Sequence, residues 1–247
     1  MMPTISISAW QCIIDESDGF DTEVSKARLL AVRRAASAFG REVSVMDAEK
    51  AYSSAAEIFE NQYLAGKPIN NIQRSNLILR ELGLNSDEKI LDTLTRELED
   101  THPANGLQVI PGATDFLKAA SQRYQIVLLS DTWMTPGRKI DALLEAAGIL
   151  TIFRCRHYSD QTGHHKINGT AFTRMTTELG LDPSAVIHIA DHWLSDANGA
   201  VSAGIGQIFL LDRPDHPVPD LPTEERPALP SLIHRESLNE ILTDILS

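Results

Sequence analysis

The sequence contains little cysteine and no long apolar run. Its 247 residues include two cysteines, Cys12 and Cys155, whose positions match neither a disulfide framework nor a Cys/His zinc spacing. No apolar stretch approaches the roughly 20 residues that a membrane-spanning helix needs. The N-terminus also lacks the basic segment of a signal peptide. These absences predict a cytoplasmic protein with reduced thiols.

The sequence also has fewer basic than acidic residues. The chain has 22 Lys and Arg against 34 Asp and Glu, which gives a formal net charge of −12. Nucleic acids and anionic membranes repel an acidic protein, so neither is expected as a partner. The hydrophobic content of 43% is ordinary for a globular chain, and the length allows one large domain or a core with an inserted domain. We expect a monomer or a homodimer.

The hydrophobic pattern changes twice along the chain. Residues Ile5 to Ile14 are rich in β-branched side chains and predict a first strand that runs into a loop. From Val24 to about Asp100, apolar residues recur with a helical period, which predicts four helices, two of them with Asp47 and Ser86 as N-caps. After a turn at residues 103–106, segments typical of strands and of helices alternate. Such alternation predicts right-handed crossovers and a parallel sheet.

The predicted fold class is therefore α/β, a Rossmann-like parallel sheet with helices on both faces and an inserted α-helical domain. We assign residues 1–14 and 107–247 to the core and residues 15–106 to the insertion. In the core, strands are expected at 125–130, 153–158, 186–191 and 207–211 and helices at 111–122, 136–147, 170–179 and 196–203, followed after a Pro-rich stretch (212–230) by a last strand and helix.

Four segments of the chain carry polar groups to one edge of this predicted sheet. One strand ends at Asp191 with Asp196 shortly after it, another ends at Ser130, Lys166 precedes a helix, and Ser8 lies in the first strand. The carboxyl ends of parallel strands form the edge where α/β proteins bind ligands. Hydroxyls, a lysine and two acids suit a phosphate or another oxyanion, with the acids able to hold Mg²⁺.

The order of these segments resembles the haloacid dehalogenase-like (HAD) hydrolase superfamily. Its motifs II, III and IV are matched by Ser130 at a strand end, by Lys166 before a helix, and by Asp191 and Asp196 after a strand. The resemblance covers nearly the whole chain and implies that the insertion is a helical cap of the C1 type. It also implies a small phosphorylated or otherwise anionic metabolite, bound between core and cap, and Mg²⁺ as cofactor.

The sequence departs from this family in motif I. Family members carry Asp-x-Asp-Gly-Thr after the first strand, where the first aspartate attacks phosphorus and ligates Mg²⁺ and the second protonates the leaving group. One subgroup reads Phe-Asp-x-Trp-Asn-Thr-Leu. The matching run here is Ile7 to Ile13, with Ser8 in place of the nucleophile, Trp10 in place of the acid/base aspartate and Cys12 in place of the threonine.

These replacements change the expected chemistry. A serine is a poor Mg²⁺ ligand and needs a base before it can attack, and a tryptophan cannot transfer a proton. We therefore expect the aspartyl-phosphate route to be lost or altered, and Mg²⁺ binding to be possible but weakened, with no other cofactor. The candidate residues are Ser8, Lys166 and Asp191 for catalysis, Trp10, Ser130, Asp131, Thr132, His165 and Lys166 for substrate binding, and Asp191 and Asp196 for the metal.

Alternatives remain at the level of sequence. Asp15 begins a second acidic run, residues 15–19, which could be a displaced motif I. A hydrogen bond from Ser8 to a histidine such as His165 or His192 could activate the hydroxyl, whereas His188 lies within a strand and is expected in the core.

Three functions are consistent with this pattern. The favoured one is a HAD-like protein that binds a small anion without conventional phosphatase chemistry. The second is a hydrolase or lyase of altered mechanism that uses Ser8 or Asp15 as nucleophile, or Lys166 with Asp191. The third is a non-catalytic regulatory or partner-binding module. In the insertion, Phe59, Tyr63 and Arg74 could contact a substrate, although packing between amphipathic helices explains them as well.

Overall fold

The computed structural model describes residues 2–17, 20–85, 87–101, 106–212 and 232–247. The contacts within the chain divide it into two compact units. Unit 1 comprises Met1–Asp15, Gln108–Thr132 and Gly137–Ser247, and unit 2 comprises Glu16–Leu107 together with Trp133–Pro136. The assignment of domains with boundaries at residues 14/15 and 106/107 stays a prediction.

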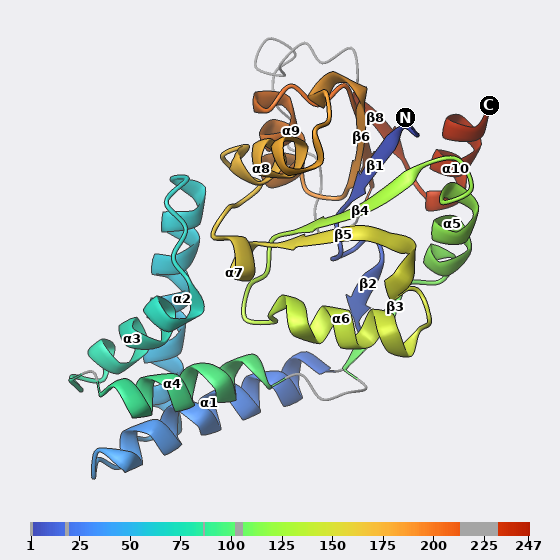
Figure 1. Ribbon diagram of the computed structural model, residues 1–247. Coiled ribbons are helices and arrows are strands. Elements are labelled where there is room, and N and C mark those ends of the chain that lie inside the picture. Colours follow the sequence, from blue (N-terminus) through green and yellow to red (C-terminus); the bar gives the residue numbers. More distant parts are fainter. Residues whose placement is uncertain (1, 18–19, 86, 102–105, 213–231) are drawn as a thin grey trace. The chain divides into compact units, whose positions relative to one another are not determined.

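Unit 1 is built on a parallel sheet, so the predicted fold class is confirmed (Figure 1). Its described strands lie in the order β5-β4-β1-β6-β7-β8, and every neighbouring pair is parallel. Non-sequential neighbours of this kind require crossover connections, which the intervening helices supply. The strands are β1 (Thr4–Ile7), β4 (Gln125–Ser130), β5 (Phe153–Tyr158), β6 (Val186–Ala190), β7 (Gln207–Leu211) and β8 (Leu232–Arg235).

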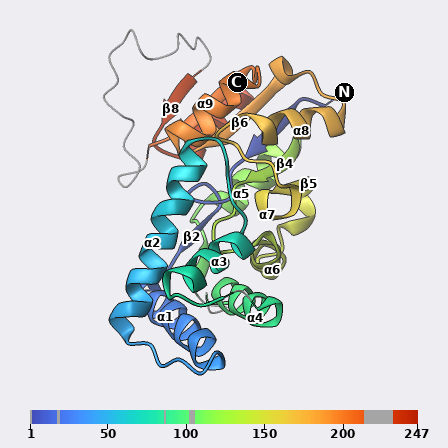
Figure 2. The same ribbon diagram turned by 90° about the vertical axis from the view of Figure 1, so that its left-hand side faces the viewer.

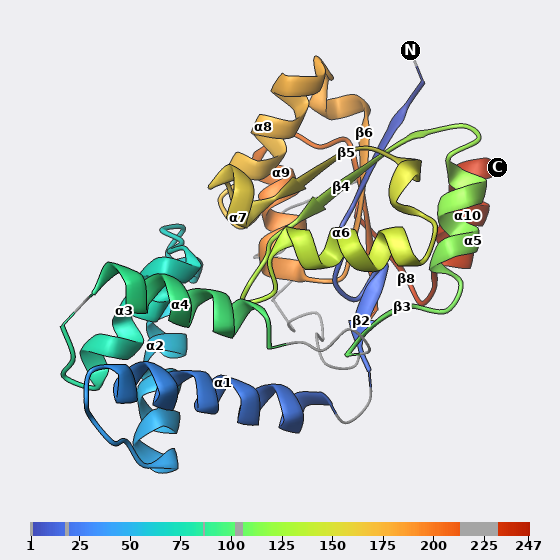
Figure 3. The same cartoon turned by 60° about the horizontal axis from the view of Figure 1, so that its bottom comes forward.

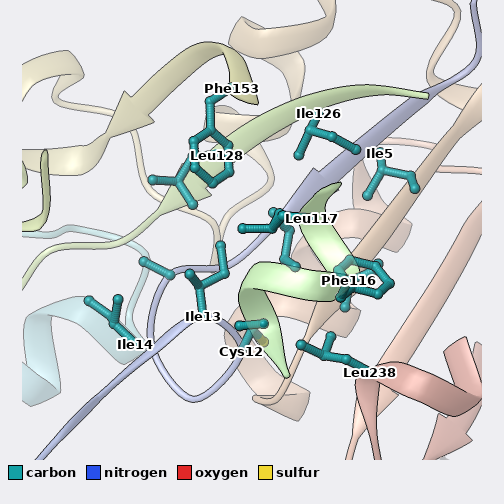
Figure 4. Close-up of a cluster of buried hydrophobic side chains, with 14 of the residues drawn as sticks. Ile5, Cys12, Ile13, Ile14, Phe116, Leu117, Ile126, Leu128, Phe153 and Leu238 are labelled. Carbon is teal, nitrogen blue, oxygen red and sulfur yellow. The ribbon is translucent and has the colours of Figure 1, made fainter. Parts of the chain in front are cut away.

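Helices cover both faces of the sheet because its central strands are apolar on both sides. In β4, Ile126 and Leu128 belong to one buried cluster, and the alternate residues Val127 and Leu129 belong to another. Figure 4 shows Ile126 and Leu128 of the first cluster beside Leu117 of helix α5. The first face is covered by α5 (Ala113–Ala120), α6 (Gly137–Ala146) and α10 (Leu238–Leu246), and the second by α8 (Thr170–Leu179) and α9 (Asn198–Ser202).

The first strand runs into a turn, as the sequence predicted. Strand β1 ends at Ile7, and the chain then turns, with Gln11 in the left-handed region at φ 56°. The amides of Ile13 and Ile14 both donate to the carbonyl of Ala9, 2.9 Å away in each case. Strand β2 (Ile14–Glu16) follows and pairs with β3 (Leu107–Val109) in a separate two-stranded sheet. The hydrophobic pattern did not mark where β1 ends, because Cys12 and Ile13 in the turn are as buried as the residues of the strand.

Unit 2 consists of helices whose apolar stripes meet in a cluster of its own. Helices α1 (Phe20–Ala38) and α4 (Glu88–Glu99) pack side by side, as Figure 3 shows. Helices α2 (Val45–Leu64) and α3 (Asn71–Glu81) also pack against each other (Figure 2). The predicted helical block is therefore confirmed.

Two N-caps in unit 2 differ from the prediction. Ser44, not Asp47, caps α2, because its hydroxyl accepts from the Asp47 amide at 3.1 Å while donating to the Asp47 carboxylate at 2.6 Å. Helix α4 is capped by Asp87, and Ser86 lies outside the described residues. In α2, Asp47 instead lies in the first turn, where a carboxylate stabilises the positive end of the helix dipole.

The segment after β6 also differs from the prediction. Instead of one helix over residues 196–203, a π-helical turn, Trp193–Ala197, precedes α9. The turn places Asp196 in the buried interior, where it is 1% exposed. The predicted turn at 103–106 and the Pro-rich stretch 212–230 lie almost entirely outside the described residues. In the described part of the chain, no helix is both long and apolar enough to cross a membrane.

We predict that Gly199→Ala is destabilising by about 1–3 kcal/mol, because an added Cβ would lie 1.8 Å from the carbonyl oxygen of Lys166. Urea denaturation measures this loss. Gly148→Ala is the matched control: its φ of 70° strains an alanine, but nothing lies within 4 Å of the added carbon, so the cost is about 1 kcal/mol. Equal costs for the two variants would contradict the close approach of α9 to the Lys166 backbone.

Candidate functional site

The candidate residues gather where three adjacent strands end. Ser8 follows β1, Ser130 is the last residue of β4, and Asp191 follows β6. Because β4, β1 and β6 are neighbours in the parallel sheet, their carboxyl ends lie at one edge. The Ser8 amide donates to the carbonyl of Ile189 in β6 at 2.9 Å, which fixes the chain at this point.

Lys166 connects these groups. Its Nζ donates a hydrogen bond to the Ser8 hydroxyl at 2.9 Å and forms an ion pair with Asp196 Oδ1. All three side chains are buried: Ser8 is 2% exposed, Lys166 3% and Asp196 1%. A lysine that donates both to a hydroxyl and to a carboxylate is held in a single orientation at the end of β1.

The surrounding charges keep Lys166 protonated. Burial lowers its pKa, but the carboxylates of Asp196, Asp131 and Asp191 more than offset burial, so that the pKa lies above its ordinary value. Burial acts on Asp196 in the opposite sense and raises its pKa. The charge of Lys166 and the contacts with His188 outweigh burial and place the pKa of Asp196 well below its ordinary value. The pair is therefore an ammonium and a carboxylate at neutral pH.

Two residues inside the strands support Asp196. His188, in β6, places Nε2 3.2 Å from Asp196 Oδ1, and its Nδ1 lies 2.9 Å from the hydroxyl of Ser6 in β1. The ring of His188 also meets Phe172 edge-on, with centroids 4.7 Å apart. Burial lowers the pKa of His188, so it is neutral at pH 7. His188 is a hydrogen-bonded core residue, as its position in a strand predicted.

Asp131 holds the loop that carries Lys166. Its carboxylate oxygens accept from the backbone amide of Lys166 at 3.1 and 3.2 Å. His165 Nδ1 lies 3.9 Å from the same carboxylate, and burial lowers the pKa of this imidazole. Asp131 therefore orients the lysine through its backbone, while the side chain of Lys166 points to Ser8 and Asp196.

Thr132 and Ser130 are bonded within the loops of the site. The Thr132 hydroxyl donates to Asp160 at 2.8 Å, and its amide donates to the Ser159 hydroxyl at 2.8 Å. Asp160, at the start of helix α7 (Ser159–Thr162), also accepts from the amide of Gly137 in α6. Ser130 donates to the carbonyl of Asp131 at 3.2 Å. These bonds fix the loop that follows β4.

The carboxylates do not converge as a metal site would require. Asp196 Oδ1 contacts the ammonium of Lys166 and the imidazole of His188, and Asp191 Oδ1 lies 4.0 Å from the thiol of Cys12. Within the described ranges, no three His, Cys, Asp or Glu side chains come together so that they could hold a metal ion. Mg²⁺ takes about six oxygen ligands, and the described side chains at this edge do not gather even three such groups. Metal binding by Asp191 and Asp196 stays a prediction.

Trp10 and Asp15, the other candidates for motif I, take no part in the hydrogen bonds that join Ser8, Lys166 and Asp196. Trp10, two residues after Ser8, is half-buried, and its indole N–H is buried without an acceptor among the described residues. Asp15 lies in β2, where its carboxylate accepts from the side-chain amide of Gln11 at 2.8 Å. The described residues show no hydrogen bond between Ser8 and a histidine. The partner of the Ser8 hydroxyl is Lys166.

Sequence reasoning missed the support given by Ser6 and Asp160. Ser6 carries no motif signal, and it is brought to His188 by strand register, in which the two residues are direct partners. The bonds of Asp160 to Thr132 and to the start of α6 could not be read from sequence spacing either.

The fold and this edge define a protein of the Rossmann-like α/β class with its polar site at the carboxyl end of a parallel sheet. A family model described as haloacid dehalogenase-like hydrolase matches residues 13–204. The chain therefore belongs to the haloacid dehalogenase-like hydrolase family, as its motif order had indicated. The match begins after the run from Ser8 to Cys12. No curated protein matches the sequence.

Solved structures share the fold over almost the entire chain. YfnB from Bacillus subtilis, in a structure bound to magnesium, is 18% identical with a TM-score of 0.61, covering 99% of this chain and 98% of its own. A HAD phosphatase from Thermococcus onnurineus is 15% identical with a TM-score of 0.61, and the same shares of the two chains are covered. L-2-haloacid dehalogenase from Xanthobacter autotrophicus is 15% identical with a TM-score of 0.56, covering 100% of this chain and 99% of its own. At these identities the likeness concerns the fold.

Removing one member of the buried ion pair is predicted to cost much more than removing both. Lys166→Met leaves the Asp196 carboxylate buried without its cation, which costs about 3–5 kcal/mol of unfolding free energy. Lys166→Met combined with Asp196→Asn removes both charges, and we expect it to recover a large part of that loss. Urea denaturation of the single and double variants measures the coupling. Additive losses would contradict the pairing.

His188 predicts a pH dependence of stability. Its folded pKa lies below the ordinary value of 6.5 because the ring is buried, so below about pH 6.5 the unfolded chain binds a proton that the folded chain does not. The unfolding free energy is then highest above pH 6.5 and falls as the pH drops toward the folded pKa. His188→Gln should show a smaller loss between about pH 7.5 and about pH 5.5 than the wild type. An unchanged slope would show that His188 does not contribute.

Proposed function

We propose that this HAD-family protein binds a small phosphorylated or otherwise anionic metabolite at the edge formed by β4, β1 and β6. In this proposal Lys166 is the principal cation and the aspartyl-phosphate route is lost. The observation that carries the proposal is the hydrogen bond from Lys166 to Ser8, the residue that occupies the position of the nucleophile. The motif I of this chain is thus degenerate at the nucleophile, and the helical insertion is its cap.

A serine at position 8 favours an anion in the absence of metal. An aspartate there would add a second carboxylate beside the Lys166 ammonium, next to Asp196. Serine keeps the hydrogen bond but contributes no negative charge, so more of the positive potential of Lys166 is left for a ligand. The buried indole N–H of Trp10, which has no acceptor among the described residues, is a further donor. These features support binding of an oxyanion.

The same contacts argue against Ser8 as a nucleophile. A lysine can accept the proton of a serine hydroxyl only when its amine is neutral. The three nearby carboxylates keep Lys166 protonated, and the bond to Ser8 runs from the ammonium to the hydroxyl oxygen. Ser8 therefore has no base in the described site. Asp15, the alternative nucleophile, lies in β2 and not at the end of β1. This location argues against attack by Asp15 on a ligand bound at the carboxyl ends of β4, β1 and β6.

The carboxylate arrangement also supports weakened Mg²⁺ binding. With a hydroxyl at position 8 and with Asp196 paired to Lys166, this edge offers a cation fewer carboxylate oxygens than a motif I with aspartate would. Mg²⁺ takes about six oxygen ligands, so each carboxylate that is replaced or already paired weakens its binding. A non-catalytic regulatory role is compatible with the same site, because regulation by a metabolite needs binding but no turnover.

The charge at position 8 provides the sharpest binding test. We expect wild type to bind inorganic phosphate saturably in the presence of EDTA, measured by isothermal titration calorimetry. Ser8→Asp should weaken binding at least about 10-fold, equivalent to about 1.4 kcal/mol, whereas the isosteric but neutral Ser8→Asn should stay within about threefold. Equal affinities of the Asp and Asn variants, or no phosphate binding by wild type, would refute the proposal.

Turnover is tested separately. Wild type and Asp15→Asn should both hydrolyse p-nitrophenyl phosphate at the background rate in the presence of Mg²⁺. Robust Mg²⁺-dependent hydrolysis by wild type that disappears in Asp15→Asn would instead identify Asp15 as the nucleophile. Hydrolysis that disappears in Ser8→Ala would identify an active enzyme of altered mechanism.

A further inference from the structure

Unit 2 contains a cluster of arginine and aromatic side chains that the core site does not use. The arginine–aromatic cluster comprises Arg28 of α1, Tyr52 and Phe59 of α2, Arg74 of α3, and Trp133. Tyr52 and Phe59 are seven residues apart and therefore lie on one face of α2. Helix α3 packs against α2 (Figure 2) and brings Arg74 to that face.

Arg74 is held by ring faces. Its guanidinium carbon lies 5.0 Å from the centre of the Phe59 ring and 5.3 Å from that of Tyr52. Its Nη2 donates to the Tyr52 hydroxyl at 3.3 Å. The side chain is 5% exposed, and its Nε is buried without a hydrogen-bond acceptor in the described part of the chain. A guanidinium has five N–H donors, and the Nε donor of Arg74 remains for a ligand.

A second cation lies close to Arg74. The guanidinium of Arg28 is 5.9 Å from the centre of the Tyr52 ring, and its Nε is likewise buried without an acceptor among the described residues. Burial, and to a lesser degree the charge of Arg28, lowers the pKa of Arg74. No ion pair of either arginine with an acid occurs in the described ranges. Two cations thus converge on Tyr52, and neither has an acidic partner within ion-pair distance among the described side chains.

Such an arrangement is costly unless an anion completes it. Contacts with aromatic faces stabilise a buried cation, but by less than the burial of an unpaired charge costs. An arginine fork is complementary to a carboxylate or a phosphate. The side chain of Trp133 contacts Phe59, with ring centroids 5.1 Å apart, and is 42% exposed. A flat apolar group can therefore reach this edge of the cluster from solvent.

We propose that the arginine–aromatic cluster is a second anion site, which binds an oxyanion carried by a flat, aromatic body. The oxyanion lies against Arg74 and Arg28, and the aromatic body stacks on Trp133. This site goes beyond the proposed function, because it is formed by unit 2 residues alone and does not involve Lys166. It selects ligands by a negative group joined to a ring, which inorganic phosphate does not have.

Benzoate and its neutral isostere benzamide test the site in the full chain. By isothermal titration calorimetry, wild type should bind benzoate saturably and benzamide at least about 10-fold more weakly. Arg74→Met should lose benzoate binding, while Arg80→Met, which removes an exposed arginine from the same helix, should retain it. Absence of benzoate binding by wild type, or equal binding by Arg74→Met, would overturn the proposal.

Two further measurements separate this site from the core site and from unfolding. Arg74→Met should still bind inorganic phosphate with wild-type affinity, because the core site does not use Arg74. If the wild type binds benzoate but not inorganic phosphate, the proposed function is refuted and the second anion site is not. If Arg74→Met does not fold, tryptophan fluorescence decides: benzoate should change the emission of wild type but not of Trp133→Phe. An equal change in both proteins would overturn the proposal.

Discussion

The buried ion pair between Lys166 and Asp196 is the interaction on which the rest of the site depends. It joins the loop after β5 to the turn after β6, and it places the ammonium against Ser8 at the end of β1. Burial alone would discharge both groups, but each keeps its charge because the other is present. His188 and Ser6 extend the pair into the sheet. The site is thus a fixed ammonium–carboxylate pair built into the fold.

Much of the fold could be predicted from the sequence, and the failures have physical reasons. Strands Gln125–Ser130, Phe153–Tyr158 and Gln207–Leu211 and helix Thr170–Leu179 have the predicted bounds, because their apolar patterns are strong and their ends are marked by turn residues or glycine. The end of β1 could not be read, since the apolar residues after it are buried in a turn. The pairing of β2 with β3 was missed because it joins three-residue segments that are far apart in the sequence.

For the site, motif order correctly predicted that Ser8, Lys166 and Asp196 come together. It could not predict that Ser6 and His188 are register partners, because register depends on the whole sheet. The arginine–aromatic cluster could not be assembled from sequence either, since Arg74 meets Tyr52 and Phe59 only when α3 packs on α2. Serine in place of the family's aspartate was visible in the sequence, but its effect on the charge around Lys166 required the structure. The family scaffold is therefore retained, and we propose that the charge balance at its centre is changed.

We propose that this charge balance supports binding of an anion and excludes a covalent phosphoryl intermediate. Intact-protein mass spectrometry after incubation with acetyl phosphate and Mg²⁺ tests it most directly, because it detects a phosphoryl adduct without any assumption about the natural ligand. We expect no phosphoryl adduct on the wild-type protein at any time point. A phosphoryl adduct that maps to Ser8 or Asp15 would contradict it.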